Sequence, residues 1–176
     1  MRTSVRMEAR TLTPSEKGGI AEMAIAAKAV LLGIPVLRPM TDGHRYDLAF
    51  DLGGTILRVQ CKWARLVRGA VEVRSNTCRN SPALGYIRGT YDADEIDLVA
   101  AYNEQLDKVY VVPIAEIAGR NALYLRVEAA RNNQSRLVHW AAQYELGAIA
   151  QLGERRHGMA EVVGSSPTSS TPPKAA

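Results

Sequence analysis

The sequence predicts an α/β (α+β) fold, in which a helix near the N-terminus is followed by a series of strands and then by a C-terminal helix. Three observations support this prediction. Apolar residues recur at the helical period between residues 15 and 32. Two strand-like runs flank Gly53-Gly54, a pair that suits the two-residue turn of a β-hairpin. Short runs rich in apolar residues continue to residue 129, ahead of a helix-like segment at 137–146.

The first helix is expected to span residues 15–32. Ser15 is a good N-cap, because its hydroxyl can accept a hydrogen bond from a free backbone N–H of the first turn. Gly33 follows the last apolar residue of the pattern and suits the left-handed conformation that ends many helices. Residues 1–12 carry no such pattern, and we expect them to form a flexible arm.

The elements after this helix are predicted from alternation of apolar residues and from turn signals. Segment 75–92 is rich in Asn, Ser, Gly and Arg, so we expect it to be a loop. The closing helix at 137–146 would place Val138, Ala141, Ala142 and Leu146 on one side. The predicted strands are 36–39, 46–52, 55–65, 69–75, 96–102, 108–113 and 122–129, with a short helix at 114–118.

The bulk composition excludes several classes of protein. The chain has 176 residues, which is enough for one domain with a core, and 47% of them are hydrophobic, so it is not a disordered protein. No apolar run reaches the roughly 18 residues of a membrane span. The charged N-terminus does not resemble a secretory signal. We therefore expect a cytoplasmic protein whose two cysteines, Cys61 and Cys78, are free thiols.

Positive charge gathers in one part of the chain. The formal net charge is +4 and the isoelectric point is about 9.2, which is compatible with a nucleic-acid partner. Between residues 58 and 88, Glu72 is the only acid. Arginine dominates this patch, and its guanidinium fork fits phosphate oxygens, although an arginine-rich surface can also reflect a high-GC genome. The arginines that we expect to contact DNA are Arg58, Arg65, Arg68, Arg74, Arg79 and Arg88.

Four residues form a possible hydrolytic site. Asp47 and Lys62 fall on the two strands of the predicted hairpin, and Gln60 shares a strand face with Lys62 because strand side chains alternate. Glu22 lies in the first helix, which could direct its carboxylate toward Asp47 if the helix packs on the sheet. Taken singly, each residue is equally compatible with an ordinary turn, edge or surface position.

Together these residues meet the needs of phosphodiester hydrolysis. Carboxylates hold Mg²⁺, which prefers oxygen ligands and stabilises charge on the scissile phosphate. Asp47 and Glu22 could supply the carboxylates, while the Gln60 amide and the Cys61 backbone carbonyl could supply further oxygens. Lys62 would be the cation that favours hydroxide or neutralises the transition state.

The ordered motifs resemble a known group of enzymes. "EKGGIAEMAIAAKAVLLGIPVLRP", then "YDLAFD" and then "LRVQCKWAR" resemble the PD-(D/E)xK nuclease superfamily. The glutamine of Gln60-Cys61-Lys62 resembles the "QxK" of the bacterial group I intron-associated homing endonuclease branch. Similarity continues through "YDADEIDLVAAYN", "VYVVP" and "WAAQYEL", so it covers about residues 13–147.

The resemblance implies both a fold and a reaction. The fold would be a restriction-endonuclease-like core, with the N-terminal helix packed on a mixed central sheet and a C-terminal helix. The reaction would be Mg²⁺-dependent hydrolysis of double-stranded DNA, in which Glu22, Asp47, Gln60 and Lys62 are the catalytic residues. The metal ligands would be Asp47, Glu22, Gln60 and the Cys61 carbonyl. Because a double-strand cut needs two active sites, the resemblance also implies a homodimer or a homotetramer.

Two departures keep other functions open. Tyr46 stands where the superfamily name has proline, and Gln60 removes one negative charge from the metal site. One alternative is a Holliday-junction resolvase-like, structure-selective nuclease. The other is a catalytically inactive DNA-binding protein on the same fold.

The C-terminal segment 148–176 differs from the rest in composition. It ends in a Ser/Thr/Pro-rich run that cannot build a core, so we expect a disordered tail. Codons allowed for residues 148–155 and 163–168 can also reproduce the D arm and the T arm of a tRNA gene. The tail is therefore either ordinary disorder or the translation of an overlapping tRNA gene.

Overall fold

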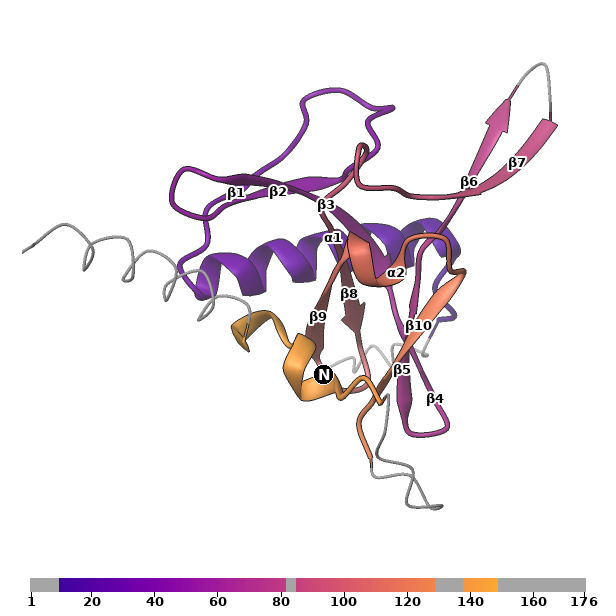
Figure 1. Ribbon diagram of the computed structural model, residues 1–176. Helices are drawn as coiled ribbons and strands as arrows, with labels where there is room; N and C mark the ends of the chain where they lie inside the picture. The colour runs from indigo at the N-terminus through magenta and orange to yellow at the C-terminus, as the bar shows by residue number, and fades with distance from the viewer. Residues whose placement is uncertain (1–9, 82–84, 129–137, 149–176) are drawn as a thin grey trace, which may run out of the picture.

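A computed structural model describes residues 10–81, 85–128 and 138–148 (Figure 1). Most of the expected N-terminal arm and nearly all of the expected tail lie outside these residues. Within the described parts of the chain, no helix is long and apolar enough to cross a membrane.

The first element is helix α1, Pro14–Leu31, which begins one residue earlier than the sequence predicted. Its N-cap is Thr13, not Ser15, because the Thr13 hydroxyl accepts from the Glu16 N–H while the Glu16 carboxylate accepts from the Thr13 N–H. Gly33 follows the C-cap with a φ of 77°, which is the left-handed conformation expected there.

A five-stranded mixed sheet lies against α1 and forms the centre of the molecule (Figure 1). Its order is β1-β2-β3-β8-β9, and every neighbouring pair is antiparallel except β3 and β8, which run parallel. The expected α+β fold, with an N-terminal helix on a mixed sheet, is therefore confirmed. The bounds are β1 Val36–Leu37, β2 Leu48–Asp51, β3 Ile56–Trp63, β8 Leu98–Asn103 and β9 Lys108–Pro113.

The chain between β3 and β8 leaves the main sheet and contributes to two smaller ones, and β10, which follows β9, completes the first of them. A three-stranded antiparallel sheet has the order β10-β5-β4. Beyond it, β6 and β7 form an antiparallel hairpin that projects away from the body of the molecule (Figure 1). The bounds are β4 Arg65–Val67, β5 Ala70–Arg74, β6 Asn76–Ser81, β7 Gly85–Thr90 and β10 Ala122–Arg126.

Two sequence predictions are wrong in this region and at the C-terminus. Segment 75–92 is not a loop but contains β6 and β7, whose backbone groups pair with each other. The closing segment forms a 3-10 helix over Ala141–Tyr144 instead of one long helix. Isolated bridges from Glu145 to Tyr110 and from Trp140 to Arg126 tie this segment to β9 and β10, so tertiary pairing overrides its helical pattern. Helix α2, Ile114–Ile117, matches its prediction closely.

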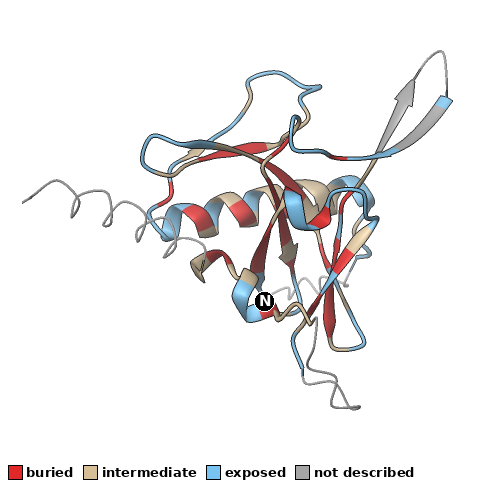
Figure 2. Ribbon diagram, viewed as in Figure 1, coloured by how far each residue is buried: buried red, intermediate tan, exposed pale blue. Residues whose placement is uncertain are grey.

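The core has two layers, one on each face of the central sheet (Figure 2). On one face α1 buries Ala21, Ile25 and Ala29 against β3 and its neighbours. On the other face, the three-stranded sheet and α2 cover residues such as Val99 and Val112. The central strands, buried on both sides, therefore form a rigid support for the loops at their ends.

Candidate active site

The hairpin of β2 and β3 holds the first carboxylate of the site. Asp47 immediately precedes β2, and its backbone N–H donates to the Val59 carbonyl at 3.0 Å. The carboxylate oxygen Oδ2 of Asp47 accepts from the Cys61 backbone N–H at 2.8 Å and from the Gln60 side-chain amide. These contacts depend on the register fixed by the tight Gly53-Gly54 turn, where both glycines have positive φ.

Strand β3 carries the glutamine and the lysine of the "QxK" motif. Gln60 is 8% exposed, and it lies on the opposite face from Cys61, which packs into the core layer beneath α1. Lys62 follows on the Gln60 face, and its Nζ donates to the Tyr91 hydroxyl at 3.4 Å. The same ammonium lies 5.1 Å from the centroid of the Tyr91 ring, a cation–π contact.

Glu22 reaches the site from α1. Its Oε2 pairs with Nη2 of Arg38 at 3.2 Å. Glu22, Arg38 and Asp47 line one polar cavity of about 130 Å³. The other lining residues, all from the segment between β1 and β2, are Pro39, Thr41, Asp42, Gly43, His44 and Tyr46.

The two carboxylates of the site both have raised pKa values. Burial raises the pKa of Glu22 above its ordinary value, and the nearby charge of Asp47 raises it further. Burial also raises the pKa of Asp47, against the lowering effects of the Cys61 N–H and the Lys62 ammonium. Arg38 lowers both pKa values by a smaller amount. A cation bound between these groups would favour their charged forms.

The donor set suits a hard divalent cation. In the described parts of the chain, no three His, Cys, Asp or Glu side chains gather as a metal cluster. Glu22 and Asp47 line the cavity, while the Gln60 amide turns its Nε2 toward the Asp47 carboxylate and, at 3.4 Å, toward the Cys61 carbonyl. Rotation of that amide would present its oxygen and give an all-oxygen set with the two carboxylates and the Cys61 carbonyl, and Mg²⁺ normally keeps several waters. Burial raises the pKa of the Cys61 thiol far above its usual range, so Cys61 is a neutral core residue that contributes only backbone groups.

Tyr91 and Arg45 were not predicted from the sequence as part of this region. Tyr91 is 6% exposed, and the Arg45 guanidinium lies 4.8 Å from the centroid of its ring. Arg45 also pairs with Glu95 at 2.7 Å. Tyr91 therefore contacts two cations, one of which is Lys62. Its position at the end of the expected 75–92 loop gave no signal of this contact.

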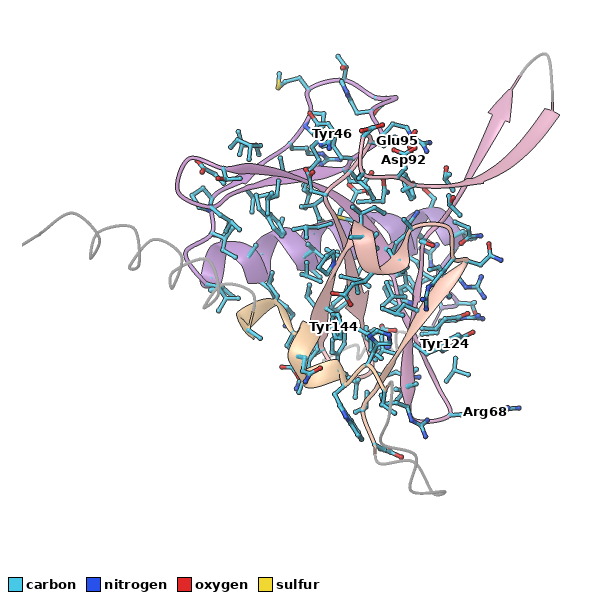
Figure 3. The ribbon with its side chains drawn as sticks, in the orientation of Figure 1. Tyr46, Arg68, Asp92, Glu95, Tyr124 and Tyr144 are labelled. Carbon is cyan, nitrogen blue, oxygen red and sulfur yellow. The ribbon has the colours of Figure 1, made fainter. Side chains whose placement is uncertain are left out.

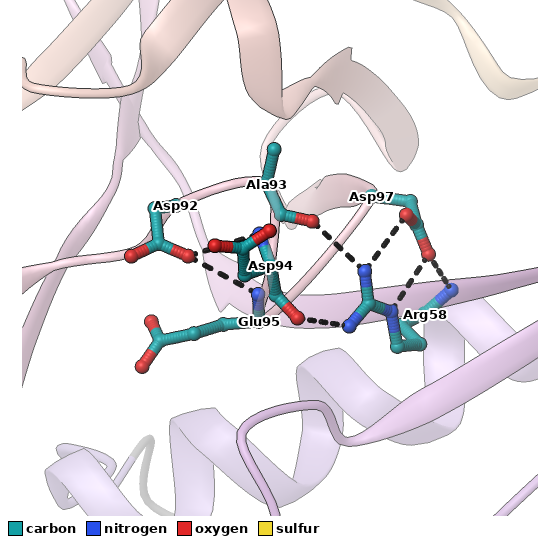
Figure 4. A network of polar contacts seen from close by, with 6 residues as sticks. All are labelled: Arg58, Asp92, Ala93, Asp94, Glu95 and Asp97. Atoms are coloured by element: carbon teal, nitrogen blue, oxygen red, sulfur yellow. Dashed lines mark hydrogen bonds and ion pairs between the residues drawn. The ribbon is translucent and has the colours of Figure 1, made fainter.

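The arginines expected to contact DNA have different environments. Arg58 forms two contacts with the Asp97 carboxylate at 3.0 Å and donates to the carbonyls of Ala93 and Asp94, so it anchors the turn before β8 (Figure 4). Its pairing with Asp97 is internal, which leaves little of the guanidinium for a ligand.

The other arginines expected to contact DNA lie on the two smaller sheets and their turns. Arg65 and Arg74 flank the buried Glu72 at 2.7 and 3.2 Å, and both remain about half exposed. Arg68 has a φ of 50° at the β4–β5 turn, at the opposite end of the molecule from Tyr46 (Figure 3). Arg79 and Arg88 lie on β6 and β7 in the backbone register, but their side chains fall outside the described part of the structure.

Comparisons with known proteins agree with this geometry. Residues 12–147 match the PD-(D/E)XK endonuclease family. Among solved structures, the chain is similar to the bacterial homing endonuclease I-Ssp6803I, with a TM-score of 0.64 and 27% sequence identity. That similarity covers 83% of this chain and 99% of the other. No match was found among the curated proteins. The resemblance drawn from the sequence motifs, to this superfamily and to its bacterial homing endonuclease branch, is confirmed.

Proposed function

This chain belongs to the PD-(D/E)XK endonuclease family, and on that premise we propose that it is a Mg²⁺-dependent endonuclease that hydrolyses phosphodiester bonds in double-stranded DNA. The observation that carries the proposal is the position of Asp47. Its carboxylate is held by the backbone of β3, on the strand that also bears Gln60 and Lys62, and it shares a polar cavity with Glu22.

In this proposal Asp47 and Glu22 hold the metal through their carboxylates. The Gln60 amide oxygen and the Cys61 carbonyl are the further ligands. When bound there, Mg²⁺ supplies charge stabilisation at the scissile phosphate and makes water more acidic. Gln60 is neutral, so Glu22 supplies the second negative charge that an acid at position 60 would otherwise provide.

Lys62 is the proposed electrostatic catalyst. Its ammonium stabilises the negative charge that develops on the phosphate, and it favours the deprotonated form of the attacking water. The contacts with Tyr91 restrict a side chain that is otherwise rich in rotamers, which lowers the entropy cost of placing the charge.

Duplex DNA is the proposed substrate, held by basic residues outside the cavity. Arg65, Arg68, Arg74, Arg79 and Arg88 would contact phosphates, which position the duplex without reading its sequence. The β6–β7 hairpin is a two-stranded ribbon that stands clear of the body, and the major groove of B-DNA admits such a ribbon. We assign base readout to this hairpin.

A homing-endonuclease-like role in the cytoplasm is the finer form of the proposal. It is supported by the similarity to a bacterial homing endonuclease and by the glutamine at position 60. We also propose a homodimer or homotetramer, because the described residues hold one such constellation and a double-strand cut needs two.

Substitution of the two hairpin residues tests the function. We expect Asp47→Asn and Lys62→Ala to lower the rate of Mg²⁺-dependent plasmid cleavage by about 10²–10³-fold. Binding of the same DNA, measured by gel shift in EDTA, should change little. Lys28→Ala is the matched control, because Lys28 is a part-buried, ion-paired lysine on α1 that pairs with Asp107 and lines a different cavity.

The substrates in this experiment separate the alternatives. Faster cleavage of four-way junctions than of linear duplex would favour the resolvase-like function. Binding without any Mg²⁺-dependent cleavage by the unmodified protein would favour an inactive DNA-binding protein. Full activity of either variant would refute the site assignment.

A further inference from the structure

We propose that Arg38 is a phosphate-binding residue of the same site, and that it pairs with Glu22 only until a metal ion takes that carboxylate. This inference rests on the proposed nuclease function and extends it to a residue outside the four proposed catalytic residues. The ligand of Arg38 would be a DNA phosphate that lies beside the two carboxylates proposed to hold the metal ion. The exchange of partners links metal binding to phosphate binding through one guanidinium.

The first argument is position. Arg38 Nη2 lies 3.2 Å from Glu22 Oε2, and Arg38 lines the same cavity of about 130 Å³ as both carboxylates. It follows β1 directly and precedes Pro39. A residue before proline is restricted to extended backbone, which directs the start of this side chain. The backbone at Arg38 is therefore restricted beside the cavity, while the long side chain can exchange one partner for another.

The second argument is the low cost of breaking the ion pair. The Arg38 side chain is 72% exposed and that of Glu22 is 28% exposed. Exposed ion pairs contribute little to stability, so the fold does not depend on this contact. A divalent cation on Glu22 would compete for the same oxygen and repel the guanidinium, so the pair would separate when the metal binds.

The third argument is the chemistry of the released group. A guanidinium presents parallel N–H donors that match two phosphate oxygens, and it stays charged at any working pH. Once it has separated from Glu22, Arg38 is an unpaired cation that still lines a cavity rich in carboxylates. A phosphodiester drawn to the metal would supply the anionic oxygens that replace the carboxylate.

The test uses the full-length protein and two substitutions. Arg38→Gln removes the charge, and Arg38→Lys keeps the charge but loses the fork. Mn²⁺ takes the same oxygen ligands as Mg²⁺, so its binding can be followed by electron paramagnetic resonance without any DNA. Cleavage rates at saturating Mg²⁺ form the second readout, and the melting temperature in EDTA forms the third.

The proposal predicts that loss of the Arg38 charge raises the affinity for Mn²⁺ and lowers the cleavage rate. Arg38→Gln should bind Mn²⁺ more tightly, on the order of threefold, because a competing cation is gone. Its maximal cleavage rate should fall about tenfold or more, because a charged hydrogen bond to phosphate is lost. Arg38→Lys should leave Mn²⁺ affinity near that of the unmodified protein while still slowing cleavage.

Arg10→Gln is the matched control. Arg10 is 73% exposed and pairs with Glu16 on the same helix α1, outside the cavity. It should change neither Mn²⁺ affinity nor cleavage. The melting temperature should stay within about 2 °C in all three variants, as expected for an exposed ion pair.

Each remaining outcome is decisive. Unchanged or weaker Mn²⁺ binding by Arg38→Gln would overturn the proposal, as would an unchanged cleavage rate. If the unmodified protein cleaves no DNA, the nuclease function fails by itself. The Arg38 exchange is then decided by the Mn²⁺ titration, together with the DNA affinity of Arg38→Gln in the presence of Mn²⁺.

Discussion

At the scale of single residues, the two carboxylates of the site lower the stability of the metal-free fold when they are charged. Glu22 and Asp47 are partly buried, and each has a pKa raised first by burial. A carboxyl group with a raised pKa binds its proton more tightly in the folded protein than in the unfolded chain. The metal-free fold is therefore destabilised as pH rises from the ordinary carboxyl pKa through the raised one.

Glu22→Gln tests this effect. Without metal, the variant should unfold at a higher temperature than the unmodified protein at pH 7, by about 1–2 °C for a change on the order of 0.5 kcal/mol. The difference should vanish well below the ordinary glutamate pKa of 4.5, where Glu22 is protonated in both states. Thermal melts in EDTA between pH 3.5 and 8 measure it. A variant less stable than the unmodified protein at pH 7 would contradict this account.

Sequence predicted some residues of the site better than others. Asp47, Gln60 and Lys62 lie on a hairpin whose turn and alternation are local, so their proximity could be predicted. The contact of Lys62 with Tyr91 joins two segments far apart in the chain, and the contact of Arg38 with Glu22 joins a strand end to a helix. No local pattern encodes such contacts, so sequence reasoning missed both Tyr91 and Arg38.

At the scale of elements, helices and strands with a strong apolar pattern were predicted from the sequence, and those with a weak pattern were not. Helix α1 and strands β2, β3, β8 and β9 lie within a few residues of their predicted bounds, and the apolar patterns of the four strands match their burial. The apolar pattern of α1 does not, because the helix buries Ala21, Ile25 and Ala29 while its larger apolar residues Met23, Val30 and Leu31 are exposed. Strands β6 and β7 contain Asn and Gly, which have low strand propensity. They are strands because they pair with each other, which composition does not reveal.

The β6–β7 hairpin can be shortened to test its role. Thr77 pairs with Gly89, so Asn-Gly in place of residues 78–88 would close a two-residue turn. We expect the melting temperature to stay within about 2 °C, because the strands of this hairpin project away from the body of the molecule (Figure 1). DNA affinity should fall at least tenfold, and the slope of log affinity against log salt should shrink by about 2, for the loss of Arg79 and Arg88. Unchanged affinity would place recognition on another element.

At the scale of the whole molecule, the number of proposed sites would decide how DNA is cut, and the described part of the chain holds one. Two chains must act together if each cleaves one strand. Coexpression of the unmodified protein with Lys62→Ala should therefore give mixed oligomers that nick supercoiled plasmid, and open circles should accumulate in place of linear DNA. Agarose gels of the purified mixed species measure this. The same ratio of linear to open-circular product as with the unmodified protein would show that one chain cuts both strands.

The parallel pairing of β3 with β8 also affects the protein while it is being made. Strand β3 carries Gln60 and Lys62, yet one of its edges stays open until residues 98–103 leave the ribosome. Pairing between strands so distant in sequence forms late, because a long loop must close first. A nascent chain therefore carries the proposed catalytic motif for dozens of residues before its partner strand is available. The proposed site would be complete only after β8 has emerged and paired with β3.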